Sequence, residues 1–190
     1  MGRAPSDKRE RLIDAAVSRF HRHGVASSSL ADIARDADIA PGNVYYHFAT
    51  KDALAAAVID SWCARIDAYL RELETVSGAG ERLRAFVERA EARRGSYTAL
   101  GCPLAALSRD LFGGALVKDA ARPLTMQQRW LAAQFEQLGV DRATADGHAQ
   151  FLLASLQGSN VLAQASADAS IISATARRLL AWLDDVQRVR

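Results

Sequence analysis

The sequence is poor in the residues on which disulfide-bonded and β-rich proteins depend. Its 190 residues include two cysteines and four prolines, and β-branched residues nowhere alternate over a long stretch. Cys63 and Cys102 are far apart in the sequence and indicate neither a disulfide framework nor a metal site, so we expect a reducing compartment. The scarcity of proline, together with abundant alanine, predicts an all-α chain.

Long hydrophobic runs and a strong charge of one sign are also lacking. No apolar segment approaches the roughly 20 residues that cross a bilayer, and no signal-peptide core is present, so we expect a cytoplasmic protein without a membrane partner. Lysine and arginine total 24 against 22 acidic residues, a net charge of +2. That balance alone does not indicate nucleic-acid binding, so any basic footprint must be local.

What the sequence does contain is the composition of a globular protein with a substantial core, with 49% hydrophobic and 24% charged residues. Apolar residues at helical spacing predict about nine helices. The clearest linker is the Ser-Gly-Ala-Gly segment at 77–80, which follows a long fourth helix. We place the domain boundary near the start of that fourth helix. The N-terminal domain then comprises residues 1–52, and the larger helical domain comprises residues 53–190.

The N-terminal domain has the pattern of three short helices. Ser29, with Asp32 three residues later, predicts a capping box at the start of the second helix. Asp38 tolerates the left-handed conformation that a tight turn needs, and Pro41 suits the first turn of a third helix. Three short helices with a tight turn between the second and the third are the helix-turn-helix plan.

The third helix carries more polar and aromatic side chains than it can bury. Val44 and Phe48 have the i, i+4 spacing of a buried face, which leaves the other side chains for a different surface. A short helix that exposes so many hydrogen-bonding groups indicates a binding partner, and we infer a DNA major groove. The alternative for the two adjacent tyrosines is ordinary packing.

These residues together resemble a known family. The segments Asp32-Ile-Ala34, Pro41-Gly-Asn-Val-Tyr-Tyr-His-Phe48 and Thr50-Lys-Asp-Ala-Leu54 closely resemble the TetR family of bacterial transcriptional regulators. The remainder of the chain resembles the family only in length and helix count. Asp38 stands where the family usually has glycine, and Ala40 replaces a frequent serine cap, a loss of about 1 kcal/mol of capping.

The resemblance implies a repressor-type regulator whose third helix enters the major groove of a DNA operator. Glycine permits close backbone approach, asparagine can read adenine, and the side chains that follow contact phosphates, thymine methyls or sugars. Hydroxyl and lysine groups at the starts of the second and fourth helices are expected to bind phosphates. The implied DNA-binding residues are Ser28, Ser29, Pro41, Gly42, Asn43, Tyr45, Tyr46, His47, Thr50 and Lys51.

One such module neutralises few phosphates, so we expect a homodimer on a palindromic operator. The last two helices carry a small-residue patch and a four-three apolar stripe, which the resemblance implies pair across a two-fold axis as a four-helix bundle. The alternative is that both faces serve the core of a single chain. The expected interface comprises Ser155, Gly158, Ser159, Leu162, Ile172, Leu179 and Leu183.

A regulator of this kind needs a small-molecule effector, and an apolar pocket in the larger domain suits a lipophilic one. The alternative for each candidate is a plain core residue. The candidates are Trp62, Tyr69, Phe86, Tyr97, Cys102, Met126, Trp130, His148 and Phe151.

Cys102 precedes Pro103 at a predicted helix N-terminus, where the helix dipole favours a thiolate. The resemblance implies that such a cysteine can sense oxidants or electrophiles, but a buried small capping residue is the interpretation that we prefer. The rival class is a Cys–His hydrolase using His148 or the His21 and His23 pair, but no local signature surrounds them. We expect no enzyme, metal or cofactor, and a dimer that retains the fold without binding DNA stays the third alternative.

Overall fold

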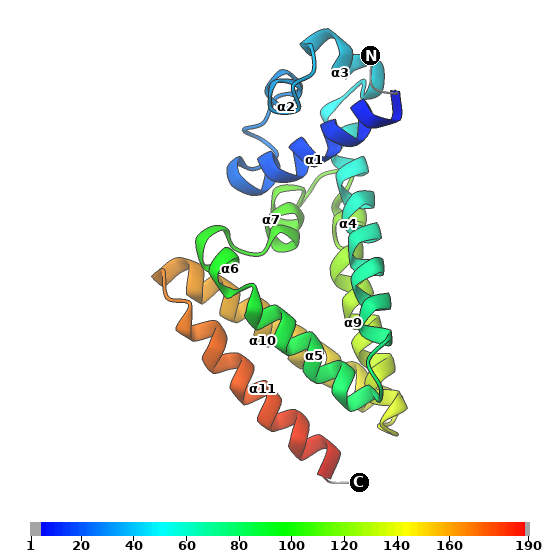
Figure 1. The fold of residues 1–190 in the computed structure, drawn as a ribbon, viewed down its shortest axis with the longest axis vertical. Helices are drawn as coiled ribbons and strands as arrows, with labels where there is room; N and C mark the ends of the chain where they lie inside the picture. The colour runs from blue at the N-terminus through cyan, green and yellow to red at the C-terminus, as the bar shows by residue number, and fades with distance from the viewer. Residues whose placement is uncertain (1–4, 189–190) are drawn as a thin grey trace. The chain divides into compact units, whose positions relative to one another are not determined.

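A computed structural model describes residues 5–188, with side chains from residue 7 onward, and all the regular secondary structure in this range is helical (Figure 1). The all-α prediction is confirmed. The helices of this range are α1 (Pro5–His23), α2 (Leu30–Asp36), α3 (Pro41–His47), α4 (Lys51–Glu74), α5 (Ala79–Ala92), α6 (Arg94–Leu100), α7 (Pro103–Asp110), α8 (Val117–Ala120), α9 (Arg122–Gln137), α10 (Arg142–Ser166) and α11 (Ser170–Arg188).

Two of these helices add to the nine predicted, and both are short. α6 forms where the sequence suggested a connection, and it ends at Gly101, which has a φ of 73°. Residues 117–137 are helical but divide at Ala121 into α8 and α9. Pro123 accounts for the division, because it has no N–H to donate back along a continuous helix.

The described chain forms two compact units, the first comprising residues 5–64 and 103–123 and the second residues 65–102 and 124–188. The predicted division at residue 52 concerns function, and it stays a prediction. Helices α4 and α9 contribute residues to both units. None of the helices between residues 5 and 188 is sufficiently long and apolar to span a membrane.

The first unit is built on α1. Helix α1 packs against α2 and α7, and α2 packs against α3 (Figure 1). Leu12, Ile33, Val44 and Leu54, one from each of the first four helices, are fully buried. This shared core is what holds α2 and α3, seven residues each, since helices this short are marginal alone.

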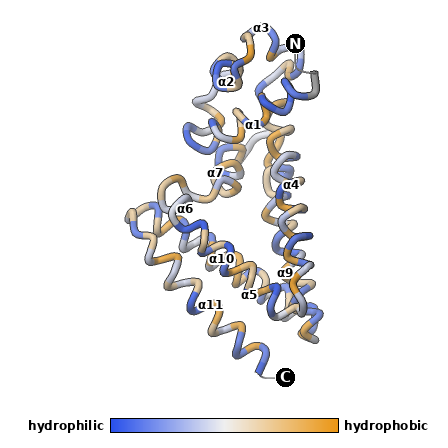
Figure 2. Tube along the Cα trace, viewed as in Figure 1, coloured by the Kyte–Doolittle hydropathy of each residue, from blue (hydrophilic) through white to orange (hydrophobic). Residues whose placement is uncertain are grey.

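The second unit has a core of aliphatic and aromatic side chains from its long helices. Helix α11 lies along α10 and α5, and α10 also packs on α6 (Figure 1). Helix α11 alternates between hydrophobic and hydrophilic residues along its length (Figure 2). Its four-three stripe, including Ile172, Leu179 and Leu183, is buried within this one chain. The prediction that these three residues form a dimer interface is therefore corrected: they serve the core.

Candidate DNA-binding interface

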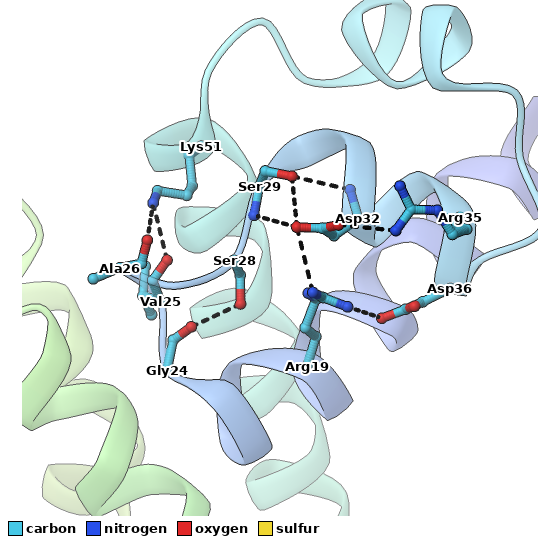
Figure 3. Close-up of polar contacts among 10 residues, drawn as sticks. All are labelled: Arg19, Gly24, Val25, Ala26, Ser28, Ser29, Asp32, Arg35, Asp36 and Lys51. Atoms are coloured by element: carbon cyan, nitrogen blue, oxygen red, sulfur yellow. Dashed lines mark hydrogen bonds and ion pairs between the residues drawn. The ribbon is translucent and has the colours of Figure 1, made fainter.

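The start of α2 is fixed by the predicted capping box, which the structure confirms. The Ser29 hydroxyl accepts a hydrogen bond from the Asp32 amide at 3.1 Å and donates one to Asp32 Oδ2 at 2.7 Å (Figure 3). Arg19 of α1 also approaches Asp32 Oδ2, at 3.3 Å, and binds Asp36 at 2.8 Å. The hydrogen bond from Ser29 is the main reason why the pKa of Asp32 lies below its ordinary value.

The segment that precedes α2 is held from three sides. The amide of Val25 donates to Asp110 of α7 at 2.9 Å. The carbonyl oxygens of Val25 and Ala26 accept hydrogen bonds from the Lys51 ammonium, at 2.9 and 3.1 Å (Figure 3). The Ser28 hydroxyl donates to the Gly24 carbonyl at 2.7 Å, and the residue is 1% exposed.

These contacts involve Ser28 and Lys51, two of the residues that were expected to bind phosphates. Ser28 is buried and does not present its hydroxyl on the surface, so its prediction as a DNA contact is corrected. Lys51 directs its ammonium at backbone carbonyls rather than outward. Ser29 stays exposed, although its hydroxyl is shared with Asp32. Thr50 is exposed and caps α4, because its hydroxyl accepts from the Ala53 amide at 3.1 Å.

The turn between α2 and α3 is a Schellman motif. The Ile39 amide donates to the Ala34 carbonyl at 2.8 Å, and the Asp38 amide donates to the Arg35 carbonyl at 3.0 Å. Asp38 has a φ of 53°, so its predicted left-handed conformation is confirmed. Ile39, next in the chain, is buried and fixes the course of the backbone toward α3.

Helix α3 presents nearly all its side chains to solvent. Val44 is its one buried residue, and Phe48 after its end is also buried. Tyr45 is 60% exposed and Tyr46 84% exposed, so neither is a core residue of the described chain. A Cβ atom placed on Gly42 would meet nothing within 4 Å.

The other residues of α3 are exposed or half-buried, as the sequence predicts. Pro41 is at the first turn and, like Asn43, is exposed, whereas His47 is half-buried and touches the ring of Tyr46 edge-on at 5.1 Å. Ala40 makes no side-chain cap, as expected where serine is lacking. We call the polar and aromatic side chains of Asn43, Tyr45, Tyr46 and His47 the α3 ridge. Val44 and Phe48, which are buried, hold α3 against the rest of the unit.

Five of the nine predicted effector residues lie in two aromatic clusters of the second unit. A first aromatic cluster is Tyr69, Phe86 and Trp130, with ring centroids 5.9 Å apart for both pairs that include Phe86. The guanidinium groups of Arg93 and Arg89 lie 5.1 and 5.8 Å from the Tyr69 ring centre. Burial raises the pKa of Tyr69 to about 12. Trp130 donates its Nε1–H to Glu74 at 2.6 Å.

A second aromatic cluster surrounds His148. Trp182 of α11 lies 4.9 Å from Phe151 and 5.1 Å from His148, between ring centres, and Phe135 lies 5.2 Å from His148. Trp182 is not among the predicted effector residues, because the pattern of the last helix predicted dimerisation. Trp182 directly precedes Leu183 of the apolar stripe, and this position could have indicated that it is partly buried.

Of the four other effector candidates, Tyr97 lies close enough to Tyr69 and Cys102 to interact electrostatically with both. Trp62 belongs to the first compact unit, and Met126 is half-buried in α9. Cys102 is 8% exposed. Burial is the main reason why the pKa of Tyr97 lies above its ordinary value. No group of three or more His, Cys, Asp or Glu side chains that could hold a metal ion occurs within the described range.

Helix α10 carries an exposed apolar face. Phe151, Val161 and Leu162 are 51%, 61% and 60% exposed, and Gly158 stands in open space. Their spacing places them on one side of the helix. Ser155 is half-buried on this side, whereas Ser159 is buried and donates to the Leu156 carbonyl at 2.8 Å. The predicted interface residues of this helix were Ser155, Gly158, Ser159 and Leu162; Ser159 is corrected because it is buried, and Val161 was not predicted.

The fold and the α3 ridge define a helix-turn-helix protein. Residues 12–58 match the sequence profile of a family described as bacterial regulatory proteins, tetR family. Residues 12–58 therefore form an N-terminal domain of the TetR family.

Individual relatives agree with this assignment. The chain is 42% identical over 55 residues to the HTH-type transcriptional regulator TtgR of Pseudomonas putida, which covers 29% of this chain and 26% of that one. It is 41% identical over 46 residues to a probable acrEF/envCD operon repressor of Escherichia coli, covering 24% and 21%. The chain thus spans about a quarter of the length of these curated relatives.

Solved structures extend the likeness to the whole fold. A TetR transcriptional regulator from Legionella pneumophila superimposes with a TM-score of 0.81 over 97% of this chain and 98% of that one, at 21% sequence identity. At this identity, the likeness shows that the fold is shared.

Proposed function

We propose that the protein is a transcriptional regulator that binds an operator in the cytoplasm through α3, as a homodimer. The observation that carries the proposal is the exposure of Tyr45 and Tyr46 on a helix that buries only Val44. Exposed aromatic and amide groups, on a helix that is held by its buried residues, can contact the base edges and the backbone of a DNA major groove. The names of the relatives favour the same activity, and one of them is a probable operon repressor, so we propose repression as the mode of action.

Within the ridge, we assign two roles. Gly42 and Asn43, at the N-terminal end of α3, approach the bases, because the glycine offers open space and the amide can pair with adenine. Tyr45, Tyr46 and His47 contact sugars and phosphates beside them. Pro41, Ser29 and Thr50 complete the surface, with the amides at the starts of α2 and α4 facing phosphates.

We propose that the dimer forms through the exposed apolar face of α10. An apolar helix face of this length is costly in water and is typical of protein interfaces. Phe151, Ser155, Gly158, Val161 and Leu162 lie on it. Paired across a two-fold axis, two such faces place two reading helices on successive half-sites.

We propose that the effector is a lipophilic molecule that contacts the cluster of Tyr69, Phe86 and Trp130 and releases the DNA. Aromatic rings with cations at their rim favour a flat, apolar ligand. Cys102 is buried, which favours reversible binding over covalent capture by its thiol.

Selection of bound duplexes from a random-sequence library tests the central activity. The full-length protein should enrich a palindromic sequence and bind it with a steep salt dependence. Tyr46→Ala should weaken that binding about ten-fold. The matched control is Phe112→Ala, which removes an aromatic side chain that is 83% exposed outside α3 and should change nothing. A wild-type protein that enriches no duplex contradicts the proposal.

A further inference from the structure

Resting on the proposed function, we infer that Arg11 is a positioning residue for DNA reading, because it closes the turn on which the placement of α3 depends. Arg11 lies on α1, 27 residues before Asp38. Its Nη2 donates to the carbonyl oxygens of Ala37 and Asp38, the latter at 3.0 Å, and lies 3.4 Å from Asp38 Oδ2. One guanidinium nitrogen therefore binds three oxygens of the same turn.

The turn needs this cation because of its own sequence. The Schellman hydrogen bonds satisfy the carbonyls of Ala34 and Arg35, which leaves those of Ala37 and Asp38 for another donor. Asp38 also holds a φ of 53°, where a side chain is strained and glycine is favoured. A carboxylate at the C-terminal end of a helix is opposed by the helix dipole, and a cation there is favoured. Arg11 donates hydrogen bonds to the two free carbonyls and brings a positive charge to the Asp38 carboxylate.

The conformation of this turn sets the direction in which α3 begins. Only Ile39 and Ala40 separate Asp38 from Pro41, and Ala40 supplies no cap of its own. With seven residues, α3 has no length to correct an error in its starting direction. A change in the turn therefore moves the whole exposed ridge, and a reading helix displaced by about 1 Å loses aligned contacts to the bases.

Asp38 and Arg11 act as a pair in this arrangement. With glycine at 38 the left-handed conformation is unstrained and the carboxylate is absent, so the turn depends less on the guanidinium, whose remaining partners are the two backbone carbonyls. Arg11→Met should thus be harmful when residue 38 is aspartate and less harmful when it is glycine. That dependence separates positioning from a direct contact between Arg11 and DNA.

The experiment measures binding of the full-length protein to a duplex selected by the wild type, across a salt series. Arg11→Met should weaken binding about ten-fold without changing the slope of log K against log salt, since no phosphate contact is lost. Asp38→Gly should bring the Arg11→Met protein back to within about two-fold of wild type. Arg22→Met removes an exposed arginine of the same helix and should leave binding unchanged.

Hydrogen exchange of the Ile39 amide, which donates to Ala34, reads the turn without DNA. It should quicken about ten-fold in Arg11→Met and recover in the double variant. Unaltered binding and exchange in Arg11→Met, failure of Asp38→Gly to rescue, or a slope lowered by about one per subunit would overturn the inference. A wild type that binds no duplex would overturn the proposed function instead, while the exchange data would still decide the role of Arg11 in the turn.

Discussion

Replacing Lys51 by methionine separates a structural lysine from a phosphate-binding one. The side chain keeps its length but loses the ammonium that donates to the Val25 and Ala26 carbonyls at 2.9 and 3.1 Å. Hydrogen bonds to charged groups contribute about 1.5–3 kcal/mol when buried. Lys51 is only half-buried and water can replace it at both carbonyls, so we expect a total loss of about 2 kcal/mol in the free energy of unfolding.

For a chain of this size, that loss lowers Tm by about 4–8 °C in a thermal scan. Operator binding should weaken, because the segment before α2 loosens, but the salt slope should stay within error of wild type. A lysine that neutralises a phosphate would instead lower the slope by about 0.9 per subunit. Lys118→Met, an exposed lysine of α8, is the control for charge and should move neither quantity. An unaltered Tm together with a reduced slope refutes the reasoning.

Three further predictions concern the core, the dimer and pH. Phe135→Ala should cost about 3–5 kcal/mol in urea unfolding, because the ring is fully buried among α9, α10 and α11, and a loss below 1 kcal/mol would contradict that packing. Leu162→Glu should convert the dimer to monomers in analytical ultracentrifugation with an unchanged helical spectrum; a persistent dimer would remove α10 from the interface. The pKa of Asp32 is lowered in the folded state, so its contribution to stability is present above the unfolded value of about 3.9 and is lost as pH falls through the folded value. Asp32→Asn should therefore lose less stability than wild type as pH falls below about 3.9, and equal losses would show that the capping box carries no such linkage.

Local features of the helix-turn-helix were predictable because they depend on neighbours in the sequence. The capping box of Ser29 and Asp32 joins residues three apart, and the left-handed turn at Asp38 follows from what its own backbone tolerates. Pro41 similarly marks the start of α3. In each case the interaction closes within one helical turn, so residue type and spacing contain the needed information.

Contacts across the chain were not predictable in this way. Lys51 binds carbonyls 25 and 26 residues earlier, and nothing near it in the sequence indicates that partner. Ser28 and Ser29 are adjacent and chemically identical, yet one is buried and the other exposed. The direction in which the backbone enters α2 decides between them, and that direction depends on α7 and α4.

The last helix shows a different limit. Its four-three spacing correctly indicated burial, but periodicity does not say whether the covering surface belongs to the same chain or to a partner. Ile172, Leu179 and Leu183 are covered by the chain itself, whereas three large apolar residues of α10 are exposed. Phe151 and Val161 had the right spacing for that face, and the larger stripe on α11 concealed it.

The base preference of an Asn43→Ala variant tests the central claim most directly. Library selection with the wild type and the variant yields two preference profiles. If α3 reads the major groove, the variant loses about 1–3 kcal/mol of discrimination at one base pair in each half-site, symmetrically about the centre of the palindrome, and keeps its preferences elsewhere. An unchanged profile, or a uniform loss at all positions, would contradict the assignment of α3 as the reading helix.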